Sequence, residues 1–188
     1  MSKPGQPSQP PDPELAATVR EVYPQLRRFF AKKVGPAEVQ DLAQETIVTF
    51  LEKDLAAIDS PRRFLFGIAR NKLLQHFDRR RPGQPFDSQR ISVRQLSTTL
   101  GTKLDRSTQI VEGLRELPLE WQIALELRYG EGLKLTEVAE AMEMSLAQIK
   151  RYLKDGLAQM REGLRERLPA GLDDEALGAA LGREYRDR

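Results

Sequence analysis

Residues 133–153 read LKLTEVAEAMEMSLAQIKRYL, and this stretch decides the fold of the C-terminal half of the chain. It divides into two runs with helical spacing, LKLTEVAEAM and LAQIKRYL, separated by the short turn EMS. A helix-turn-helix needs a small residue where its helices meet and a cap after its turn, and Ala139 and Ser145 stand at those positions. The stretch is therefore typical of a helix-turn-helix, whose second helix enters the major groove of DNA.

The second helix of this motif carries side chains that suit contacts with DNA. Packing between the two helices would use the apolar residues Met144 and Ile149, which leaves the polar and basic positions outside. The candidate DNA contacts are Ser145, Gln148, Lys150, Arg151 and Lys154. Gln suits adenine, and Arg or Lys suits guanine. The alternative is an ordinary helical hairpin with solvated charges, and this segment alone leaves both interpretations open.

Outside the motif, the chain shows helical spacing of apolar residues and no convincing strand alternation. The predicted helices cover residues 14–33, 37–53, 61–80, 109–116, 119–129, 135–142 and 146–167. We expect Pro24 to divide or kink the first helix and Ser60 to cap the third. A further short helix is expected within residues 169–188.

This order of helices predicts an all-α protein with two small domains joined by a flexible linker. Residues 82–108 hold prolines, glycines and many polar residues, with scattered apolar residues such as Val93 and Leu96, so we interpret them as linker and not core. Residues 1–13 have too little apolar surface to offset the entropy of ordering. The predicted divisions are a disordered tail at 1–13, a first domain at 14–81, the linker at 82–108, a second domain at 109–168 and an extension at 169–188.

Composition excludes most enzyme chemistries. The chain of 188 residues has no cysteine and a single histidine, His76, so disulfides, thiolate metal sites and His-based clusters or triads are excluded. We therefore expect no catalysis, no metal and no cofactor. The sequence has neither a signal-peptide pattern nor 18 uninterrupted apolar residues, so we expect a cytoplasmic protein without membrane insertion.

Charge is balanced over the whole chain and uneven within it. The net charge is only +2, from 30 basic and 28 acidic residues, yet residues 61–81 hold seven basic residues and one acid. A cationic helix with interleaved aromatic residues suits DNA phosphates and unstacked bases. The alternative is that the cations at 79–81 only oppose the helix dipole.

Acidic and amide side chains gather on the helix predicted at 37–53. Asp41 and Glu45 are four residues apart, as are Gln40 and Gln44, so each pair shares a face of the helix. Such a face suits a basic partner surface. A carboxylate pair can also indicate acid–base catalysis or a metal, but the chain supplies no matching constellation.

Three segments, in order, resemble the extracytoplasmic-function branch of the sigma-70 family of RNA polymerase sigma factors. They are EVQDLAQETIVTFLEK at 38–53, SPRRFLFGIARNKLLQHFDRRR at 60–81 and LRELPLEWQIALELRYGEGLKLTEVAEAMEMSLAQIKRYLKDGL at 114–157. Their order and separation match the family's region 2, a variable linker and region 4. The resemblance implies a sigma factor that binds core polymerase, directs it to specific promoters and assists promoter melting.

For the first domain, the resemblance implies binding to the clamp helices of the polymerase's largest subunit. The residues that match this role are Glu38, Asp41, Gln44 and Glu45. The connector at 52–60 would hold a flipped base of the minus-ten element. The following helix would face promoter DNA through Arg62, Arg63, Arg70, Asn71, Arg79 and Arg80. Relatives usually have a small residue at Val39 and an acid at Gln40, so we expect a weaker or altered polymerase contact here.

For the second domain, the resemblance implies that the helix-turn-helix binds the minus-thirty-five element and that the domain contacts the flap of the second-largest subunit. Arg151, Tyr152 and Asp155 depart from the residues common in relatives, so the promoter sequence does not transfer. IKRYLKDGL and IARNKLLQHFDRRR are similar to the iron-uptake-type subgroup, whose members commonly answer to a membrane-bound anti-sigma factor.

The sequence leaves two alternative functions open, and it also allows a prediction for the C-terminal extension. The protein could be a stand-alone helix-turn-helix regulator that binds duplex DNA as a dimer. It could also be a sigma-like protein or sigma antagonist that binds polymerase or a regulator without opening promoters. In the extension, Leu172, Leu177 and Leu181 have helical spacing, which predicts a helix that docks on the second domain or on a regulator.

Overall fold

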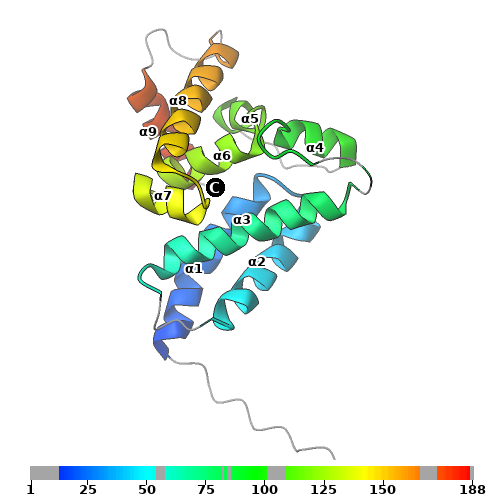
Figure 1. Cartoon of the computed structure of the whole chain (residues 1–188), viewed down its shortest axis with the longest axis vertical. Coiled ribbons are helices and arrows are strands. Elements are labelled where there is room, and N and C mark those ends of the chain that lie inside the picture. The colour runs from blue at the N-terminus through cyan, green and yellow to red at the C-terminus, as the bar shows by residue number, and fades with distance from the viewer. Residues whose placement is uncertain are drawn as a thin grey trace, which may run out of the picture.

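The structure is a computed structural model that describes residues 13–53, 58–81, 83, 86–100, 109–165 and 173–186. Within those ranges all regular structure is helical, and the one β contact is an isolated bridge between Ser92 and Pro118. The predicted all-α class is therefore confirmed. Figure 1 shows one group of helices packed on another, with α3 lying along the junction between them.

The N-terminal bundle consists of α1 (Pro13–Ala31), α2 (Pro36–Leu51) and α3 (Pro61–Arg79). Its core is aromatic: the Phe29 ring meets the rings of Phe30 and Phe66 edge to face, at centroid distances of 5.3 and 5.8 Å. Helix α1 continues through Pro24, so that residue does not divide it. Ser60 is the N-cap residue of α3, as predicted, but its hydroxyl makes no capping bond and lies instead 3.5 Å from a carboxylate oxygen of Glu137.

The C-terminal bundle consists of α5 (Gln109–Arg115), α6 (Leu119–Leu125), η2 (Glu126–Gly130), α7 (Leu135–Ala141) and α8 (Leu146–Gly163). The predicted helix-turn-helix is present as α7 and α8, with Ala139 and Ile149 buried between helices. Ser145 caps α8, because its hydroxyl accepts the backbone N–H of Gln148 at 3.2 Å. The helix predicted at 119–129 widens in its second half into the π-helical segment η2.

Part of the predicted linker belongs to the core. Helix α4 (Val93–Leu100) places Val93 and Leu96, three residues apart, on one fully buried face. Two backbone hydrogen bonds attach the preceding segment to the start of α6, from Leu119 to the Ile91 carbonyl (2.9 Å) and from Glu120 to the Ser88 carbonyl (3.1 Å). The expectation that this stretch adds nothing to a core is therefore wrong for Val93 and Leu96.

The C-terminal extension forms the predicted helix, α9 (Asp174–Arg186). The Asp173 carboxylate accepts the backbone N–H of Ala176 at 2.8 Å and caps its first turn. Leu177 and Leu181 are buried where α9 contacts η2, α5 and α8, so the predicted docking on the C-terminal bundle is confirmed. The third leucine of the predicted stripe, Leu172, lies outside the described residues.

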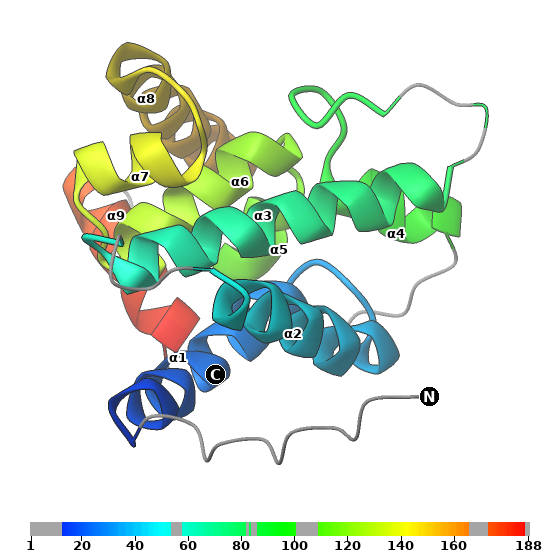
Figure 2. The same cartoon turned by 60° about the horizontal axis from the view of Figure 1, so that its bottom comes forward.

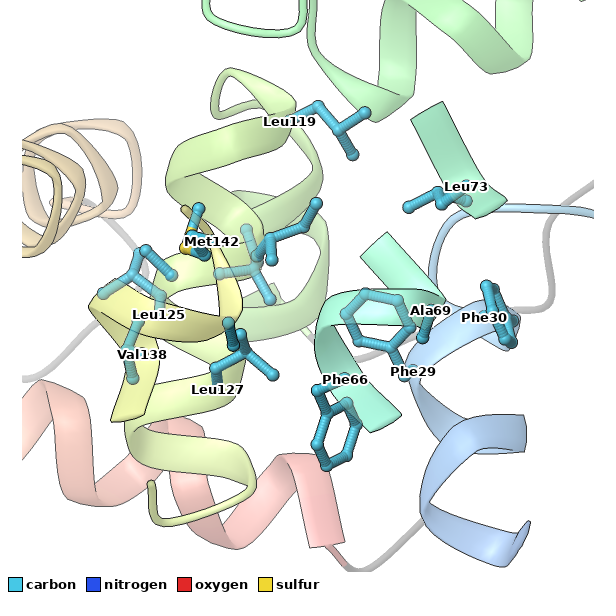
Figure 3. Packing of buried hydrophobic residues seen from close by; sticks show 14 of the residues in the cluster. Phe29, Phe30, Phe66, Ala69, Leu73, Leu119, Leu125, Leu127, Val138 and Met142 are labelled. Carbon is cyan, nitrogen blue, oxygen red and sulfur yellow. The ribbon is translucent and has the colours of Figure 1, made fainter. Parts of the chain in front are cut away.

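One apolar core crosses from the N-terminal bundle to the C-terminal bundle. Figure 3 shows Phe66, Ala69 and Leu73 of α3 between Phe29 and Phe30 of α1 on one side and C-terminal residues such as Leu119 and Leu127 on the other. The two halves therefore pack directly against each other. Nothing in the spacing of the sequence predicts this contact.

A buried ion pair also joins the two bundles. Lys33 follows α1, and its ammonium contacts the Glu126 carboxylate and donates to the Phe29 carbonyl at 2.7 Å. Both charged side chains are fully buried, and the Gln122 amide donates to Glu126 at 2.7 Å. Burial lowers the pKa of Lys33 to about 8, against the attraction of the Glu126 carboxylate.

We expect Lys33→Met to lower the free energy of unfolding by about 3–5 kcal/mol, because it leaves Glu126 charged and buried without a counter-charge. Lys33→Met/Glu126→Leu should recover much of this loss, because it removes both charges. Chemical denaturation of the two variants measures the difference. A double variant as unstable as the single one would show that packing, and not charge, dominates at this point.

Candidate nucleic-acid interface

The outer face of α8 presents the cations predicted to contact DNA. Lys150, Arg151 and Lys154 are exposed, while Ile149 and Leu153 of the same helix are buried. Helix α8 lies at the edge of the molecule farthest from α1 and α2, as both Figure 1 and Figure 2 show. The second helix of the helix-turn-helix is therefore accessible to a duplex in this arrangement.

Gln148 is held in place by another residue of α8. Its amide nitrogen donates to the Tyr152 hydroxyl at 3.0 Å, and the buried Tyr152 ring packs 5.9 Å from the Trp121 ring. A glutamine reads adenine with both ends of its amide. Donation of one N–H to Tyr152 leaves the second N–H and the carbonyl oxygen of Gln148 for a base edge, but it fixes the orientation of the amide.

The cations predicted to bind the minus-ten element divide into two groups. Arg79 and Arg80 are exposed near the C-terminal end of α3, where Arg80 pairs with Glu38. The others lie against the C-terminal bundle. Arg70 is the most buried of them and forms two hydrogen bonds with the Glu120 carboxylate, at 2.6 and 2.9 Å.

Three more α3 side chains bond to glutamates of the C-terminal bundle. Arg62 donates to Glu131 at 3.0 Å, Arg63 pairs with Glu140, and the Asn71 amide donates to Glu143 at 3.4 Å. Glu131 is almost wholly enclosed, and burial raises its pKa against the attraction of Arg28 and Arg62. Glutamate carboxylates thus occupy the positions that the predicted DNA phosphates would need. Sequence reasoning named the cations and missed the glutamates opposite them.

A groove of about 480 Å³ opens where α2, α3 and α7 meet. Lys53, Phe64 and Lys72 line its N-terminal side, and Glu140 and Glu143 line the other. Without the α7 wall, this would be an open cationic surface with an aromatic ring, which suits an unstacked base. The connector predicted to hold such a base, at 52–60, lies partly outside the described residues.

The residues predicted to bind polymerase share the outer face of α2. Asp41, Gln44 and Glu45 are exposed, and Glu38 is half-buried beside Arg80. Two apolar neighbours, Val48 and Leu51, are also exposed, with exposed fractions of 55% and 43%. Of the two positions at which a departure from relatives was expected to alter the polymerase contact, Gln40 lies on this surface, whereas Val39 is buried in the core.

Known families match both halves of the chain. The family described as Sigma-70 region 2 matches residues 18–82, and Sigma-70, region 4 matches residues 107–160. The chain belongs to the sigma-70 family of sigma factors. These matched ranges contain α2, α3 and the helix-turn-helix, so the three surfaces described above lie within the regions that define a sigma factor.

The fold of this sigma factor is also that of a solved structure. The sigma factor RpoE from Bartonella quintana, determined in complex with the anti-sigma factor NepR, is 16% identical, with a TM-score of 0.63. The similarity covers 82% of this chain and 99% of that chain. At this identity it shows the fold alone. Among curated proteins, none gives a significant match.

In the described part of the chain, no group of histidine and acidic side chains is arranged to hold a metal ion. None of the helices in the described ranges is both long and apolar enough to cross a membrane.

We expect Tyr152→Phe to change the base preference of this sigma factor at a single position of the duplex site predicted for α8. The substitution keeps the ring against Trp121 and removes the hydroxyl that orients the Gln148 amide, so the amide can align its oxygen and one N–H with adenine. Preference for adenine there should gain up to about 1–3 kcal/mol, the value of a bidentate contact. Selection from a randomised duplex library measures it.

The matched control for this experiment is Gln148→Ala, which identifies the position that Gln148 reads. Equal preferences in Tyr152→Phe, Gln148→Ala and the unchanged chain would mean that Gln148 makes no base contact.

Proposed function

We propose that this sigma factor binds core RNA polymerase, directs it to specific promoters through the minus-thirty-five and minus-ten elements, and assists promoter melting in the cytoplasm. The observation that carries the proposal is the occurrence, in one chain, of the exposed acidic and apolar face of α2 together with the cationic α3. A regulator that only binds duplex DNA needs neither.

The α2 face suits a basic coiled coil such as the clamp helices of the largest subunit. Asp41 and Gln44 supply charge and hydrogen-bonding groups, and Val48 supplies apolar surface beside them. Acidic and amide groups around an apolar centre give both orientation and buried area. In this proposal the C-terminal bundle contacts the flap of the second-largest subunit while α8 reads the minus-thirty-five element.

Melting requires no catalytic residue, and sigma factors are non-enzymatic initiation factors. Binding of an unstacked strand by α3 cations and nearby aromatic rings lowers the free energy of the open promoter relative to the closed one. Arg62, Arg63, Arg70 and Asn71 take part only once their glutamate partners have moved away. Arg79 and Arg80 are accessible at the outset.

One alternative draws support from the structure of α3. A sigma-like protein that binds polymerase without opening promoters would keep its α3 cations paired with glutamates, as they are here. The proposal also includes an anti-sigma factor that regulates this chain. The related RpoE was determined with an anti-sigma factor, and we propose that this chain answers to one as well, held at the membrane as in the subgroup that it resembles.

The test mixes the full chain with bacterial core polymerase and measures binding and transcription from a library of promoters from the source genome. We expect promoter-specific initiation that depends on the chain. Asp41→Ala should weaken core binding by about 1–2 kcal/mol, the usual cost of losing an important interface side chain.

Glu21→Ala removes another exposed acid of the N-terminal bundle, on α1, that the proposal does not place at the polymerase, and it should leave core binding unchanged. Duplex binding as a dimer without any affinity for core would indicate the stand-alone regulator. Core binding without transcripts from any promoter would indicate the sigma-like protein.

A further inference from the structure

Helix α9 lies outside both matched regions and is seated closely on η2. Gly182 packs against the Tyr129 carbonyl so closely that a Cβ atom there would lie 2.5 Å from its oxygen. In the same way, a Cβ atom at Gly178 would lie 2.5 Å from the Tyr129 ring, and one at Gly130 would lie 2.5 Å from the Tyr185 ring. Three glycines therefore permit this approach, which any side chain would prevent.

Tyr185 extends this contact to the junction of the two bundles. Its ring is fully buried, and the Lys32 ammonium lies 4.7 Å from the ring centroid. Burial, and then the nearby carboxylates of Glu126 and Glu131, raise the pKa of Tyr185. The same two carboxylates bind Lys33 and Arg62 of the N-terminal part. Tyr185 thus packs beside the glutamates that hold the bundles together.

Both ends of α9 are fastened by charged side chains. Arg161 of α8 pairs with Asp174 at the start of the helix. Near its end, Arg186 donates to the carbonyls of Tyr129 and Gly130 at 3.3 and 3.5 Å. These contacts fix the end of η2 and the start of the turn that carries Glu131.

We infer that α9 is an internal clasp that keeps the C-terminal bundle on α3 and so withholds the α3 cations from single-stranded DNA in the free protein. In the closed form Arg62, Arg63 and Arg70 are paired with glutamates of the C-terminal bundle, while the outer faces of α2 and α8 stay accessible. Polymerase can therefore bind α2 before α3 is released. The claim that the released α3 binds single-stranded DNA rests on the proposed function. The claim that α9 keeps the bundles together does not.

The absence of cysteine from the chain makes the closure directly measurable. Asp78→Cys on α3 and Ala158→Cys on α8 are exposed positions in different bundles, and two dyes there report the distance between the bundles by energy transfer. Into this labelled full chain we introduce Gly182→Val, which drives a side chain into the Tyr129 carbonyl. The matched control is Gly163→Ala, where no atom lies within 4 Å of the added methyl group.

We expect high energy transfer in the labelled chain and in Gly163→Ala, and lower transfer in Gly182→Val with helix content retained. Binding of a short mixed-sequence single-stranded oligonucleotide, followed by anisotropy, should strengthen about tenfold or more in Gly182→Val, because a mostly closed protein offers α3 only in its minor open state. Unchanged transfer in folded Gly182→Val, or opening without tighter binding, would overturn the clasp.

A second variant decides the matter if Gly182→Val does not fold. Arg161→Ala/Arg186→Ala alters two exposed side chains and removes the fastening at both ends of α9, namely the pair with Asp174 and the hydrogen bonds to the Tyr129 and Gly130 carbonyls. It should also lower the transfer and strengthen oligonucleotide binding, although it removes two positive charges. A double variant with unchanged transfer and unchanged oligonucleotide binding would overturn the clasp. Variants that open but fail to bind core polymerase would support the clasp and contradict the proposed function.

Discussion

Two buried cations of the N-terminal half depend on carboxylates from the C-terminal half, and the arrangement of the bundles follows from this. Lys33 and Arg70 lie in surroundings with little water, where an unpaired charge costs several kcal/mol (about 3–5 when one partner is removed). Glu126 and Glu120 satisfy them from consecutive turns of η2 and α6. Apolar contacts such as Phe66 with Leu127 favour burial in many orientations, but these pairs fix one of them.

The same α3 cations serve both the closed protein and the proposed DNA-bound one. A carboxylate and a phosphate oxygen present similar acceptors to an arginine, so the guanidiniums of Arg62 and Arg63 exchange one partner for another when α3 is released. The half-exposed ion pair of Arg63 with Glu140 adds little to stability. The enclosed pair of Arg70 with Glu120 is different, because Arg70 needs a new anionic partner when it leaves Glu120. Exchange of equivalent partners keeps the free-energy difference between the two forms small.

The sequence predicts what depends on local spacing and misses what depends on distant contacts. Apolar residues every three or four positions predicted the helices, and Ser145 and Ala139 predicted the helix-turn-helix. The cations of α3 and the acids of α2 were also predicted, because they stand close together in the chain. Arg70 and Glu120 are separated by 50 residues, and no local pattern pairs them. The burial of Val93 and the contact of the Ser60 hydroxyl with Glu137 likewise depend on residues far away in the chain.

The extension shows why a weak local signal can carry a specific role. Leu177 and Leu181 predict only that α9 is amphipathic, whereas the fit on η2 depends on the absence of side chains at Gly130, Gly178 and Gly182. Such a contact is either fully made or lost, because a rigid backbone carbonyl cannot yield gradually to an added atom. A clasp of this kind, placed beside Glu126 and Glu131, therefore favours two discrete arrangements of the bundles over a continuum between them.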